Sequence, residues 1–83
     1  MKKYLIKKTY TATRDSEYVK EGCNQTWYIG KNVSDRKLCD YIKERAYSRK
    51  YFAEKYIRND KDYNKRMNSD FWKIDYEIIE VNL

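Results

Sequence analysis

The sequence contains no histidine and no proline, and its only glycines are Gly22 and Gly30. Without an imidazole there is no Ser-His or Cys-His pair to activate a nucleophile, and the commonest general base is missing. Two isolated glycines cannot build a glycine-rich phosphate-binding loop. These absences exclude the common designs of hydrolases and nucleotide-dependent enzymes, so we expect a protein that is not an enzyme.

Only two close pairs of acidic residues lie outside the first loop, Asp60-x-Asp62 and Asp75-x-Glu77. A two-metal centre needs carboxylates that converge in a cleft. The first pair falls in a predicted loop, where we expect it to support a turn, and the second falls on the polar face of a predicted strand. We therefore expect no catalytic residues.

Cysteine is also scarce, since only Cys23 and Cys39 occur and no Cys-x-x-Cys spacing is present. A structural zinc site takes about four nitrogen or sulfur ligands, which two thiols do not supply. We interpret both cysteines as small apolar side chains in a reducing compartment. The expectation is a chain with no metal site, no cofactor and no disulfide bond.

Eighty-three residues correspond to a single domain spanning 1–83. So short a chain has a thin core, and ten Tyr, two Trp and two Phe supply most of the large apolar surface. The apolar stretch near the start is interrupted by Lys7 and Lys8, so it is too short for a signal peptide. No run is long enough to span a membrane. We expect a cytoplasmic protein with no membrane partner.

Alternation of apolar and polar residues predicts three strands. The first covers 2–13, and its apolar face is broken only by Lys8. The second covers 25–29 and ends in a turn at 30–32, after a polar loop at 14–24. The third begins at Trp72, and the consecutive Ile78 and Ile79 predict either a bulge or burial on both faces.

The middle of the chain has helical periodicity. Ser34 is the predicted N-cap, apolar residues follow through Ala46, and the stripe falters at Arg49 before it resumes at Phe52. One continuous helix and a helix broken near 48–50 both remain open. Residues 59–70 are polar and predict a loop, with at most a short helical turn around Tyr63.

These elements predict an α+β fold, in which a small antiparallel sheet of β-β-α-β order has one long or kinked helix packed on one face. The expected core consists of large apolar residues on the inner faces of these elements: Trp27, Leu38, Ile42, Trp72 and Ile74.

The net charge of +6 is unevenly distributed. Residues 1–13 carry four lysines and no acid, and residues 34–66 carry eleven basic and six acidic groups. Basic side chains interleaved with tyrosine can contact phosphates and stack on bases. Alternatively, the strand lysines pair with the acidic residues of the last strand. The candidate binding surface consists of basic and aromatic residues of the predicted helix: Arg36, Lys43, Tyr47, Arg49, Lys50, Tyr51 and Arg58.

Lys, Asn, Ile and Tyr have AT-rich codons and supply 36 of the 83 residues. Together with the small size, this composition suggests an accessory protein of a phage or mobile element. By analogy with anti-CRISPR inhibitors, we expect it to bind and inhibit a host protein or ribonucleoprotein, because six acids dilute the charge of the basic region. The alternatives are a nucleic-acid-binding protein and a protein that self-associates through a sheet edge.

Overall fold

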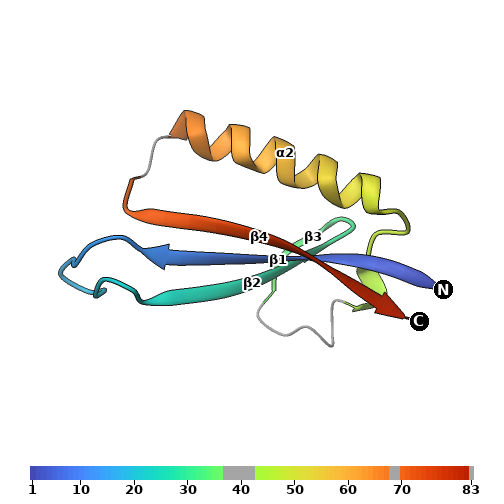
Figure 1. Cartoon of the computed structure of the whole chain (residues 1–83), viewed down its shortest axis with the longest axis horizontal. Helices are drawn as coiled ribbons and strands as arrows, with labels where there is room; N and C mark the ends of the chain where they lie inside the picture. Colours follow the sequence, from blue (N-terminus) through green and yellow to red (C-terminus); the bar gives the residue numbers. More distant parts are fainter. Residues whose placement is uncertain (37–42, 68–69, 83) are drawn as a thin grey trace.

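A computed structural model describes residues 1–36, 43–67 and 70–82. In chain order the elements are β1 (Lys2–Ala12), β2 (Asn24–Gly30), β3 (Val33–Arg36), a 3₁₀ turn η1 (Lys43–Arg45), α2 (Lys50–Met67) and β4 (Trp72–Asn82). The strands form one antiparallel sheet of order β3-β2-β1-β4, and α2 runs beside it (Figure 1). The predicted α+β fold is confirmed, with one strand more than expected.

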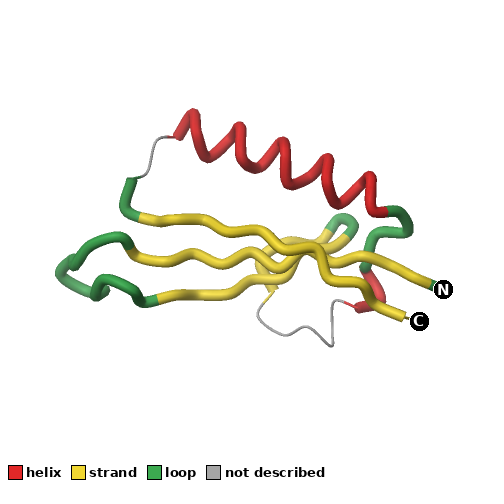
Figure 2. Tube along the Cα trace, viewed as in Figure 1, coloured by secondary structure: helices red, strands yellow, loops and turns green. Residues whose placement is uncertain are grey.

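Both chain ends lie at the end of the sheet where α2 begins, whereas the loop between β1 and β2 forms the opposite end (Figure 2). Side chains organise this loop: a carboxylate oxygen of Asp15 accepts a hydrogen bond from the Glu21 amide at 2.8 Å, and the Ser16 hydroxyl accepts one from the Val19 amide at 3.0 Å. The loop is therefore an ordered projection of the sheet. No helix of the described chain has the length and apolar character needed to cross a membrane.

The extra strand replaces the predicted start of the helix. Asn32 has a φ of 58°, a left-handed conformation that asparagine tolerates, and it folds the chain back so that Val33 pairs with Gly30. The prediction of Ser34 as a helix N-cap is therefore wrong, because Ser34 lies in β3. A tight hairpin turn overrides a local capping signal.

The helix begins and ends later than the apolar pattern indicated. The alternative of one continuous helix is wrong, since α2 starts at Lys50 and the backbone of Tyr47 exchanges two hydrogen bonds with that of Tyr4 in β1, at 2.9 and 2.7 Å. Residues 37–42 of the predicted helix lie outside the described part of the chain. The predicted loop at 59–70 is wrong through residue 67. Its inward positions are polar, so apolar periodicity could not reveal that α2 continues.

The sheet is buried on both faces near the chain ends. On the α2 side, Ile6 and Ile29 pack with Ala53 of the helix. On the other side, Leu5 packs with Ala46 and Val81. The register between β1 and β4 runs without a shift past Ile78 and Ile79, so burial of both faces, and not a bulge, explains the two consecutive isoleucines.

The core is built from smaller residues than expected. Among the residues whose burial is described, Leu5, Ile6 and Ile29 are the largest fully buried side chains. Trp27, Trp72 and Ile74 are only half-buried, so their assignment to the core is wrong. Leu38 and Ile42 lie outside the described residues.

The lysine that interrupts the apolar face of β1 is buried beneath α2. Lys8 is only 4% exposed, and its Nζ lies 2.6 Å from Oδ2 of Asp60 on the helix. The same oxygen accepts hydrogen bonds from the Tyr76 hydroxyl and, at 3.1 Å, from the Asn64 amide. We call Lys8, Asp60, Asn64 and Tyr76 the Lys8 cluster. It places Asp60 inside the protein, and not in the surface turn expected from the sequence.

The cluster changes the protonation of two of its members. Burial alone would lower the pKa of Lys8, but the hydrogen bond and charge of Asp60, together with Tyr10, outweigh it and raise that pKa. Burial raises the pKa of the Tyr76 hydroxyl, and its hydrogen bond to Asp60 acts in the same direction. Both groups therefore stay protonated well above neutral pH.

We predict that Asp60→Ala destabilises the fold by about 3 kcal/mol, because it leaves Lys8 buried without a counter-charge. Replacing both partners, as in Lys8→Met with Asp60→Leu, should recover most of that loss. Urea unfolding measures both effects. Asp62→Ala is the matched control, since Asp62 is exposed on the same helix. Equal stability of the Asp60→Ala and Asp62→Ala proteins would contradict the assignment.

The raised pKa values predict a loss of stability in alkali. A proton held more tightly in the folded state stabilises the protein fully below the unfolded pKa, near 10 for both Lys and Tyr, and this stabilisation is lost as the pH rises further. Thermal unfolding between pH 7 and 11.5 should therefore show a falling Tm above about pH 10. Tyr76→Phe should make the fall shallower, whereas Tyr63→Phe, at an exposed position, should not. Parallel curves for wild type and Tyr76→Phe would refute this origin.

Gly30 marks a close approach of two backbones. A Cβ at this position would lie 2.4 Å from the Arg45 carbonyl oxygen, which accepts a hydrogen bond from the Lys31 amide at 2.6 Å. We predict that Gly30→Ala costs about 1–3 kcal/mol, since main chain must move to accommodate the methyl group. Ser48→Ala, at an exposed neighbouring position, is the control. A Tm equal to that of wild type would show that the approach is not rigid.

Candidate binding surface

The residues of the predicted binding surface, all expected on one helix, belong to different elements. Arg36 ends β3 and Lys43 begins η1, and the structure does not describe the side chains of these two residues. Tyr47 and Arg49 precede α2, and only Lys50, Tyr51 and Arg58 lie on it. The premise of a single helix is therefore wrong, while a role of these residues in binding stays a prediction.

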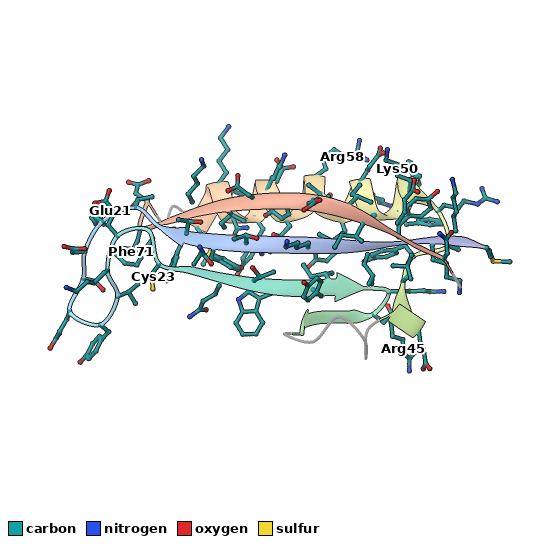
Figure 3. All side chains as sticks on the ribbon, turned by 60° about the horizontal axis from the view of Figure 1, so that its bottom comes forward. Glu21, Cys23, Arg45, Lys50, Arg58 and Phe71 are labelled. Carbon is teal, nitrogen blue, oxygen red and sulfur yellow. The ribbon has the colours of Figure 1, made fainter. Side chains whose placement is uncertain are left out.

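Within this set, the structure brings together the exposed residues of α2, away from the η1 turn that contains Arg45. Lys50 and Arg58 extend on the α2 side of the sheet, whereas Arg45 extends on the opposite side (Figure 3). Tyr51 is 58% exposed and meets Phe52 edge to face at 5.6 Å. Tyr47 is half-buried, and burial raises the pKa of its hydroxyl.

The surface of α2 is more basic than its sequence suggests. Six of its basic residues are exposed: Lys50, Lys55, Arg58, Lys61, Lys65 and Arg66. Of its three acids, Glu54 and Asp62 are exposed, but Asp60 is turned inward and paired with Lys8. The helix therefore presents a net positive field to solvent on the side facing away from the sheet.

A hollow of about 480 Å³ lies beside the first half of α2, and we call it the N-terminal hollow. Its lining combines aromatic, amide, hydroxyl and basic side chains from the helix, the turn before it and the turn after β2: Lys31, Tyr47, Ser48, Phe52, Lys55, Tyr56 and Asn59. Two lysines line it, and none of the described lining residues is acidic. Such a recess suits an anionic group next to an aromatic or apolar one.

A second hollow of about 340 Å³ lies over the other end of β2 and β1, and we call it the tryptophan hollow. It is lined by Tyr10, Gln25, Trp27 and Trp72. Tyr10 lies opposite Gln25 in the sheet, and Trp27 lies opposite the buried Lys8, so these side chains share the face on which α2 lies. The hollow thus occupies the part of this face that the helix leaves open.

Aromatic and cationic contacts extend the tryptophan hollow along the sheet. Tyr10 meets Trp72 at 6.1 Å with an interplanar angle of 83°, and Trp72 meets Phe71 at 5.0 Å and 90°. The guanidinium of Arg14 lies 5.8 Å from the Phe71 ring centre. Perpendicular neighbouring rings form corners in which a planar group can contact one ring face and one ring edge.

Sequence reasoning missed the tryptophan hollow because it assigned both tryptophans to the core. Large aromatic residues at alternating strand positions usually indicate a buried face. The signal that could have corrected this is Gln25, an amide two residues before Trp27 on the same face, together with Lys8 opposite Trp27. A sheet face carrying amide and lysine side chains among its rings is not uniformly buried.

No model of a known protein family, no curated protein and no solved structure matches this chain.

Proposed function

We propose that this chain is a non-catalytic protein that binds a nucleic acid through the side of the molecule on which α2 lies. The observation that supports the proposal most directly is the burial of Asp60 against Lys8. It removes an acid from a helix that exposes six basic residues and only two acidic ones. Sequence-independent affinity for nucleic acids depends on such a local excess of positive charge.

The exposed rings of α2 add a second kind of contact. Phe52 and Tyr63 lie on the same side of the helix as Lys55, at the three-to-four-residue spacing of one helical face, and both rings are about half exposed. Aromatic side chains between basic ones stack on bases while the cations contact phosphates. The charge argument that favoured a protein partner relied on six acids diluting the eleven bases of residues 34–66, whereas the surface of α2 exposes two acids among six bases.

A host-protein partner, bound and inhibited in the manner of an anti-CRISPR protein, is the second candidate. The supporting observation is the exposed edge-to-face pair of Tyr51 and Phe52, beside the N-terminal hollow that Phe52 lines. Aromatic anchors next to a recess are typical of the residues that dominate protein interfaces. The exposed, free thiol of Cys23 fits either role in a reducing cytoplasm.

The first candidate predicts salt-dependent binding that is localised to α2. Fluorescence anisotropy with random-sequence oligonucleotides should give micromolar affinity at physiological salt. Replacing Lys50, Arg58 and Lys65 by Ala should reduce the slope of log affinity against log salt by about 2–3, because each lost phosphate contact removes about 0.7–0.9.

The matched control replaces Lys20, Arg45 and Lys73 by Ala, which removes the same charge from the loop, the opposite side and the opposite sheet face. It should leave the slope nearly unchanged. An equal reduction in both triple variants would show that only net charge matters. If the wild-type protein binds no nucleic acid at physiological salt, and lysate capture returns a protein partner that survives nuclease treatment, the second candidate is correct.

A further inference from the structure

We propose that the nucleic acid is single-stranded and that one of its bases enters the tryptophan hollow while its backbone follows β2 toward Lys31. This inference rests on the proposed function and names the form of the partner. The elements of the site are three rings and one amide at one end of β2, and two lysines at the other. No base of an intact duplex can enter such a recess, because its faces are stacked and its pairing edge is occupied.

The helix leaves this part of the sheet accessible. α2 packs mainly against β1 and β4, reaches β2 at Ile29, and is connected to β1 and β4 by the Lys8 cluster. Trp27 of β2 and Trp72 at the start of β4 stay half-buried on the same face, and the described lining of the tryptophan hollow includes no residue of α2. The rings are held by the sheet, so they form a rigid platform that loses little conformational freedom when a base stacks on it.

The shape of the tryptophan hollow suits a planar ring. Tyr10 and Trp72 stand almost perpendicular, so a base against the face of one meets the edge of the other. The exposed amide of Gln25 offers both donors and an acceptor to the pairing edge of that base. A volume of about 340 Å³ lies at the small end of ligand sites, enough for a base but not for a folded protein segment.

Positive charge lies at both ends of this platform. Lys31 and Lys55 line the N-terminal hollow, and Arg14 lies against Phe71 beyond the tryptophan hollow. Along β2, Gln25 and Lys31 are about 20 Å apart at the usual rise of an extended strand. That span corresponds to a site on the order of four nucleotides. Lys8 adds no free charge, because Asp60 neutralises it within the cluster.

The two tryptophans supply the assay, since both line the hollow and no other tryptophan is present. Titration with an eight-nucleotide oligothymidylate should quench the intrinsic fluorescence, and a duplex of the same length should bind more weakly and quench little. Trp27→Leu should weaken binding roughly 5- to 150-fold, the range expected for loss of one base-stacking contact. Tyr18→Ala, which removes an 88% exposed ring from the β1–β2 loop, is the matched control and should bind as wild type does.

Two further variants keep the test decisive if Trp27→Leu fails to fold, as judged by circular dichroism. Gln25→Ala alters an exposed side chain and should change the relative affinities for oligothymidylate, oligoadenylate and oligocytidylate. Lys31→Ala with Lys55→Ala should reduce the salt slope by about 1.4, because each phosphate contact to a single strand contributes about 0.7. The exposed pair Lys20→Ala with Lys73→Ala controls for net charge.

The outcomes separate this inference from the proposed function. Binding without quenching, wild-type affinity in the Trp27→Leu and Gln25→Ala proteins, or equal affinity for duplex would overturn the inference while nucleic-acid binding stands. Absence of binding to every oligonucleotide would overturn both. Equal quenching and affinity with poly-glutamate would instead indicate an acidic peptide as the occupant and would overturn the inference.

Discussion

The ion pair between Lys8 and Asp60 connects the two layers of this protein. A lysine on the inner face of the central strand is tolerable only if a carboxylate reaches it, because a buried unpaired charge is strongly destabilising. The helix must therefore place Asp60 directly over β1, and hydrogen bonds from Tyr76 and Asn64 complete the coordination of the carboxylate. The described core on the α2 side is small, with Ile6, Ile29 and Ala53 as its buried residues, and this polar contact adds a directional connection between α2 and the sheet.

The surface proposed for binding follows from the same constraint. With α2 held over β1 and β4, Ala53 covers Ile29 of β2, whereas Gln25 stays exposed and Trp27 half-buried, and the rings of Trp27 and Trp72 border the tryptophan hollow. The carboxylate used internally no longer offsets the exposed bases of the helix. One buried ion pair thus both opens the aromatic platform and makes the helix beside it more basic.

The chain between the sheet and the helix is positioned by backbone contacts. The Arg45 carbonyl accepts the Lys31 amide, which requires the absence of a side chain at Gly30, and Tyr47 pairs with Tyr4 beyond the end of β2. These contacts extend the sheet on the β2 side of β1 and set the point at which α2 can begin. They also bring Lys31 beside the first turns of the helix, where the N-terminal hollow forms.

The sequence by itself determined β1, β2 and β4, because alternation of apolar and polar residues is a local property that β1 and β4 follow over nearly their whole length. It also determined the turn after β2 and the absence of any histidine. Only the tertiary structure decided where the helix lies. Ser34 has a side chain that favours a helix N-cap, yet it lies in β3, which pairs with β2 after the turn at Asn32. In the sequence, Asp60 and Asn64 are typical of a loop. In the fold they lie on the inner side of α2, where they contact Lys8 and Tyr76. The tryptophan hollow likewise depends on how far α2 reaches across the sheet. That position depends on the pairing of Lys8 with Asp60, two residues far apart in the sequence, so no local pattern reveals it.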